Sequence, residues 1–133
     1  MCHMETVEFL ILKNLLYNEE YVRKVIPFIK GDYFEDRNQK IVFEEIINFV
    51  QEYNQPVTKE VLCIEAEKRQ DITDESFKEI TQLIGSLEDQ PSEFEWLVNT
   101  TEKWCRDRAI YLALMESIQL ADGKDDTKGR DAI

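Results

Sequence analysis

The chain has 133 residues and a mass of 15.8 kDa, the size of one domain, and this leaves no room for two full hydrophobic cores. Hydrophobic residues make up 43% of the sequence, which argues against a disordered chain, and no apolar run approaches the roughly 20 residues of a membrane-spanning helix. The 16 basic and 28 acidic residues give a formal charge of −12, which disfavours direct binding to phosphates of nucleic acids.

Hydrophobic side chains recur at spacings of three and four along most of the chain, and no segment of any length alternates as a strand does. This pattern predicts a helix over residues 5–17, a short one from residue 19 to the residue before Pro27, and a third that ends at 54–56. Two further helices are predicted over 59–69 and from 74 to a loop at 85–91. The predicted N-caps are Asn18, Asp36, Thr58 and Thr73.

The longest predicted helix begins after Ser92, which we interpret as a capping box with Glu95. It continues to Ala121 without Gly or Pro, for about 29 residues or roughly 43 Å at 1.5 Å per residue. A small globule does not need a helix of this length. The sequence therefore predicts an all-α fold, a small helical bundle followed by one long protruding helix.

The second half of this helix carries apolar residues almost all round, which is typical of a helix with partners on more than one side. A heptad-like spacing leads from Leu97 and Trp104 to Tyr111 and beyond. Core packing explains the first part of this seam, and a helix–helix contact is the favoured interpretation of the second part. The candidate interface residues are Tyr111, Leu112, Leu114, Met115 and Ile118.

No catalytic, cofactor-binding or metal-binding constellation is predicted. The four glycines are isolated, so no phosphate-binding loop is present, and the one histidine and three cysteines lack the short paired spacings of a zinc site. Carboxylate pairs such as Glu44/Glu45 are interpreted as solvated helix faces. Residues 71–95 hold eight acids against Lys78, either a docking face for a basic partner or, as we favour, a solvated surface with acids at helix starts.

Several short stretches together carry a family resemblance. They are Tyr33-Phe34-Glu35, Ile41-Val42-Phe43, residues 52–57, 95–98, 101–103 and 108–109, and the opening segment 11–21. In their order and spacing these stretches resemble the N-terminal domain of DnaB-type hexameric replicative helicases, and most closely those of T4-like tailed phages. The resemblance covers roughly residues 5–121.

The resemblance implies a helical globule followed by a helical hairpin. In that family the hairpins pair between subunits, and the domains form a collar that also docks primase. ATP and magnesium, and the contacts to single-stranded DNA, belong to a C-terminal domain that this sequence lacks, so no enzyme activity is expected of this chain alone. Residues 111–120 would form the first hairpin arm. Residues 122–133 would form a charged turn or linker, cut before the second arm, and the location would be the cytoplasm of a bacterial host.

A second hypothesis comes from another class of protein. The acidic composition is also compatible with a free-standing helical adaptor, or a DNA mimic, that binds a basic protein partner. An adaptor would be expected to end with its hydrophobic surface covered, so the apolar end of the long helix favours the helicase domain.

Overall fold

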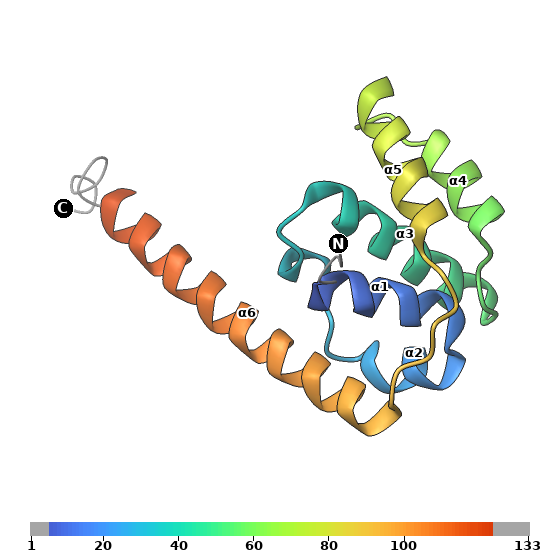
Figure 1. Ribbon diagram of the computed structural model, residues 1–133. Helices are drawn as coiled ribbons and strands as arrows, with labels where there is room; N and C mark the ends of the chain where they lie inside the picture. Colours follow the sequence, from blue (N-terminus) through green and yellow to red (C-terminus); the bar gives the residue numbers. More distant parts are fainter. Residues whose placement is uncertain (1–5, 124–133) are drawn as a thin grey trace, which may run out of the picture.

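A computed structural model describes residues 6–123, and this part of the chain folds into helices without any strand. Five helices form a body, and the sixth runs along its lower edge and projects far beyond it (Figure 1). The predicted all-α fold with one long protruding helix is confirmed. The elements are α1 (Val7–Tyr17), α2 (Glu19–Val25), the 3-10 helix η1 (Gly31–Tyr33), α3 (Arg37–Tyr53), α4 (Lys59–Glu67), α5 (Asp74–Ser86) and α6 (Phe94–Gly123).

Side-chain caps start the helices of the body. The four predicted N-caps of α2 to α5 are confirmed, since each side chain accepts a hydrogen bond from a backbone N–H of the first turn. Helix α1 begins later than predicted because Thr6 leaves the helix to cap it, accepting from the N–H of Phe9. At the other end of α3, Asn54 adopts a left-handed conformation with φ of 52° and stops the helix.

The start of α6 differs from the predicted capping box. The carboxylate of Glu93, and not the hydroxyl of Ser92, accepts the N–H of Trp96 at 2.7 Å and that of Glu95 at 3.4 Å. A carboxylate can accept two of the free N–H groups of the first turn, and its charge is favourable at the positive end of the helix dipole. Helix α6 also continues to Gly123, two residues past the predicted end.

Helix α3 lies at the centre of the body, in contact with α1, α4, α5 and η1, and the first half of α6 closes the core against α1, α2 and η1. The buried apolar side chains come from every helix. Among residues 6–123, no helix is long and apolar enough to cross a membrane. The most deeply buried large side chains include Ile11, Leu12, Tyr21, Ile41, Ile46, Leu62, Ile80, Ile84, Leu87 and Leu97.

Candidate protein-interaction surface

Aromatic rings hold α6 against the body where it passes η1. The ring of Trp104 lies 5.0 Å from that of Phe34 and 6.0 Å from that of Tyr33, both in edge-to-face arrangements. Phe34 in turn packs on Phe43 of α3, with ring centroids 5.1 Å apart. Helix α6 is therefore fixed to α3 through η1 by a continuous aromatic cluster.

One turn further along α6, Arg108 joins this helix to the body through a hydrogen bond and an ion pair. Its Nε donates to the backbone oxygen of Tyr33 at 2.6 Å, and its guanidinium pairs with Glu35 at 3.3 Å. The same guanidinium lies 4.9 Å from the ring centroid of Tyr111, which begins the projecting part of the helix. We call residues 109–121 of α6 the arm.

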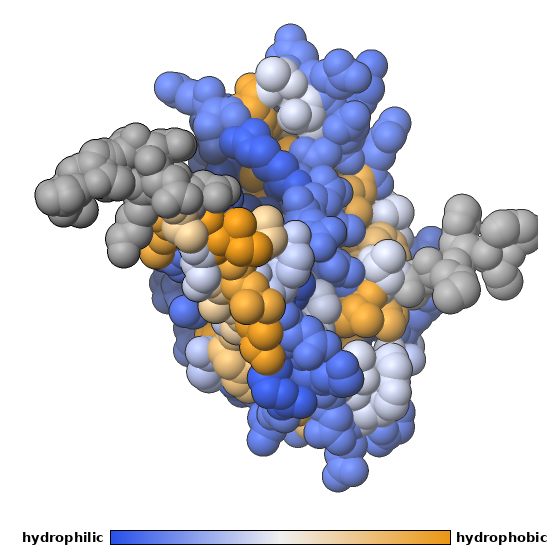
Figure 2. Space-filling view, turned by 90° about the vertical axis from the view of Figure 1, so that its left-hand side faces the viewer, coloured by the Kyte–Doolittle hydropathy of each residue, from blue (hydrophilic) through white to orange (hydrophobic). Residues whose placement is uncertain are grey.

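The stripe of α6 that packs on the body continues along the arm, where no other helix packs on it among residues 6–123. At spacings of four and three, Leu97, Thr101, Trp104 and Arg108 are buried or half-buried against the body. The same spacing then reaches residues 111, 115 and 118, where the body has ended. Figure 2 faces the side from which α6 projects and shows hydrophobic side chains as an orange band there. The arm therefore presents a helix-packing surface that nothing in this chain occupies among residues 6–123.

The five predicted interface residues all lie on the arm. Tyr111, Leu114 and Ile118 are exposed by 49%, 59% and 54%, high values for large apolar side chains. Leu112 and Met115 are partly covered. The candidate set omitted Ile110 and Leu120, which are as exposed as the others. Leu120 points almost opposite to Ile118 because residues two apart do not share a helix face, so the arm is apolar on more than one side.

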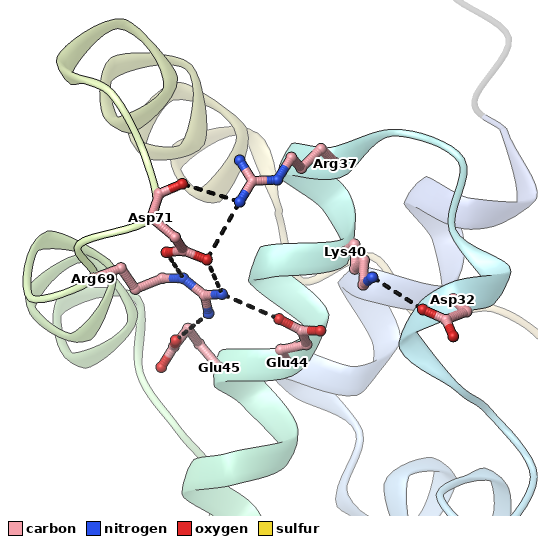
Figure 3. Close-up of polar contacts among 7 residues, drawn as sticks. All are labelled: Asp32, Arg37, Lys40, Glu44, Glu45, Arg69 and Asp71. Carbon is pink, nitrogen blue, oxygen red and sulfur yellow. Dashed lines mark hydrogen bonds and ion pairs between the residues drawn. The ribbon is translucent and has the colours of Figure 1, made fainter.

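A second cluster, of charged side chains, joins α3 to the turn between α4 and α5 (Figure 3). The Arg69 guanidinium donates to Glu45 at 2.7 Å, to Glu44 at 3.3 Å and twice to Asp71 at 3.1 Å. Arg37 reaches the same Asp71 at 3.0 Å and 3.3 Å. Glu44 and Glu45 are therefore not simply solvated, because a planar guanidinium has donors that meet two neighbouring carboxylates in different directions.

The charges in this cluster shift one another's protonation. Hydrogen bonds to Asp71 raise the pKa of Arg69, and the Arg69 guanidinium holds the pKa of the Asp71 carboxyl below its usual range. The cluster has an acid for every cation, which makes it an internal clamp between α3 and the α4–α5 pair rather than a site for an anion. No group of His, Cys, Asp and Glu able to hold a metal ion occurs in the described part of the chain.

Most acidic residues in the stretch 71–95 lie at the ends of helices or take part in contacts within the protein. Asp71 belongs to the clamp, Asp74 and Glu75 lie in the first turn of α5, and Glu93 caps α6. Glu79 accepts a hydrogen bond from Asn38 at 2.8 Å. The solvated-surface interpretation accounts for these positions, while Glu88 and Asp89 stay exposed in the loop before α6.

Fold and surface together define an all-α domain with a long helix whose projecting part exposes large apolar side chains. Residues 1–95 match the family described as the DnaB-like helicase N terminal domain. The chain is also 31% identical, over 111 residues, to the DnaB-like replicative helicase of Enterobacteria phage T4. That alignment covers 84% of this chain and 23% of the phage protein's length. The chain belongs to the DnaB-like helicase N-terminal domain family.

Proposed function

We propose that this chain is the N-terminal collar domain of a hexameric ATP-dependent replicative DNA helicase, where it mediates subunit assembly and primase docking and has no ATPase activity of its own. The uncovered stripe on the arm carries this proposal, together with family membership. ATP, magnesium and single-stranded DNA would be bound by a separate C-terminal domain. The corresponding location is the cytoplasm of a bacterial host.

The arm is suited to pairing with another helix. Its apolar residues follow the seam that already packs on the body, so a second helix can lie along the same stripe as in a coiled coil. Burying a large aliphatic or aromatic side chain fully is worth about 1.5–3 kcal/mol, and on the stripe Tyr111 and Ile118 are exposed by 49% and 54%. Pairing between arms of two subunits would cover them.

In this proposal residues 5–121 are the collar domain and residues 122–133 are a charged turn or linker. Helix α6 includes residues 122 and 123. Residues 124–133 lie outside the described part of the chain.

Self-association of the isolated chain tests the assembly role. We expect concentration-dependent oligomers in sedimentation equilibrium, and a Met115→Glu/Ile118→Glu variant should remain monomeric because charges on the stripe cannot be buried. The matched control is Ser117→Glu/Gln119→Glu, which places the same charges on exposed polar positions of the same helix. A wild-type chain that stays monomeric, or two variants that behave alike, would refute the role of the stripe.

Primase docking has its own test. We expect the fluorescently labelled chain to bind the primase encoded in the same genome, measured by fluorescence anisotropy, and not to bind an unrelated DNA-binding protein of similar positive charge. Equal binding to both proteins would favour the acidic adaptor or DNA mimic instead, because charge alone would then explain the interaction.

A further inference from the structure

A hollow lined by apolar side chains lies on the side of the body away from the arm. It has a volume of about 450 Å3, within the usual range for binding pockets, and lies between the α1–α2 corner and the end of α3. Leu15, Leu16, Val22, Ile26 and Val50 form its apolar wall. The amide side chains of Gln51, Asn54 and Gln55 surround the opening. In Figure 1 this corner is on the right of the body, whereas α6 projects to the left.

A smaller, polar hollow of about 160 Å3 continues from the first one. The two hollows adjoin at Tyr17 and Glu19, which line both, and we refer to the pair as the groove, with an apolar end and a polar end. The hydroxyl of Tyr17 donates to the backbone oxygen of Leu87 at 2.9 Å and fixes the ring between them. Asp89 and Pro91, from the loop before α6, line the polar end.

The charges around the groove favour a cation at its polar end. Arg23 on the apolar side is already paired with Glu19 at 2.9 Å. Lys13 also lines the polar end, but it is only 3% exposed and its ammonium donates to Gln90 at 2.7 Å, so it is held by contacts within the protein. Asp89 and its neighbour Glu88 are left facing solvent. The last turn of α3, which borders the apolar end, holds no basic side chain to offset the negative end of the helix dipole.

We propose that this groove binds a segment of a partner protein in which a bulky apolar residue is followed closely by Lys or Arg. The apolar side chain fills the hollow between α2 and α3, and the basic side chain reaches the carboxylate of Asp89. The net charge of −12 on the chain attracts such a partner at long range. The groove is separate from the arm, so this binding does not depend on self-association or on the helicase role.

Synthetic peptides provide the probe. We expect peptides with a Leu-Phe pair followed by lysines to give saturable shifts of backbone amide NMR signals, confined to residues that line the groove. Two matched peptides, one with glutamates for the lysines and one with serines for the Leu-Phe pair, should bind at least about tenfold more weakly, as expected when an anchor residue is lost. Shifts outside the groove, or equal binding of all three peptides, would overturn the proposal.

Variants of the chain test the same groove from the protein side. Ile26→Lys should weaken peptide binding by about tenfold, while Ile64→Lys, the same change at an exposed site on α4, should have no effect. Asp89→Lys should weaken binding more than Glu67→Lys, which changes the net charge equally.

Circular dichroism checks that the variants are folded. If Ile26→Lys is unfolded, Gln51→Lys replaces it, because Gln51 lines the groove and is exposed. Equal effects within each pair contradict the proposal.

Discussion

The phenol oxygen of Tyr21 and the hydroxyl oxygen of Thr101 lie 2.6 Å apart, and both side chains are completely buried. This hydrogen bond joins α2 to α6 in a layer that is otherwise mostly apolar. A buried hydroxyl without a partner is costly, so only one register of α6 on the body satisfies both groups. The pair therefore fixes how far α6 slides along the body.

Removing this hydrogen bond is expected to destabilise the domain. Tyr21→Phe should lower the free energy of unfolding by about 1–2 kcal/mol, because the Thr101 hydroxyl loses its partner. Tyr53→Phe is the matched control, since Tyr53 is exposed and its ring should tolerate loss of the hydroxyl. Urea denaturation followed by circular dichroism measures both. Equal stability of the two variants would show that the hydrogen bond contributes nothing.

The same tyrosine predicts how stability changes at alkaline pH. Burial raises the pKa of Tyr21 well above its ordinary value, with a smaller opposing effect from the hydrogen bond to Thr101. The unfolded chain loses this proton near pH 10, whereas the folded chain keeps it. The stability that depends on keeping Tyr21 protonated is therefore fully present below about pH 10 and is lost as the pH rises further. Denaturation series above pH 10 should show a shallower loss of stability for Tyr21→Phe than for wild type.

The clamp around Arg69 should contribute more to stability than an exposed ion pair. Arg69 is only 19% exposed, so Arg69→Met leaves Glu44 and Glu45 beside Asp71 without the cation that they share. Asp71 keeps its pair with Arg37, so the loss falls mainly on Glu44 and Glu45. We expect it to be about 2 kcal/mol, between the values for exposed and fully buried pairs. Arg23→Met, which breaks an exposed pair within α2, is the control and should change little. Thermal unfolding compares the two variants. Similar melting temperatures would show that the clamp does not stabilise the domain more than the exposed pair does.

Two cysteines should differ sharply in reactivity. Burial, and then the charge of Glu102, raises the pKa of Cys105 to about 12, while Cys63 is only partly buried and its pKa is also raised. Because the thiolate is the reactive form, a disulfide reagent at pH 8 should modify Cys63 well before Cys105. A Cys2→Ser background removes the third thiol. In concentrated urea both should react together, and equal rates in the folded protein would contradict the buried position of Cys105.

Local features of the fold could be predicted from sequence because they depend on neighbouring residues. Asn18 and Asp36 cap helices whose first turns follow them directly, so their roles are visible in a few residues. Ser92 was misassigned because it and Glu93 are both acceptors beside the same helix start. Sequence offers no rule for which of them adopts the cap geometry.

Contacts between distant segments could not be predicted in this way. The periodicity of α6 runs unchanged through Arg108 and Tyr111, and only the position of η1 determines where the body ends and the arm begins. Arg69 meets Glu45 across 24 residues of chain, and no local pattern links them. The groove is likewise built from residues that resemble ordinary core positions, such as Leu15 and Val50, until packing leaves a hollow between them.

The anchoring of α6 at Trp104 and Arg108 makes the arm a lever. From Arg108 to Gly123 the helix extends about 22 Å, so a tilt of roughly ten degrees at its base moves the end by about 4 Å. This displacement is sideways and approaches half of the roughly 8–10 Å between the axes of packed helices, so it would change how closely the end of the arm meets a neighbouring helix. Small repacking of η1 beneath Trp104 would thus be amplified into a change of packing distance at the far end of the arm.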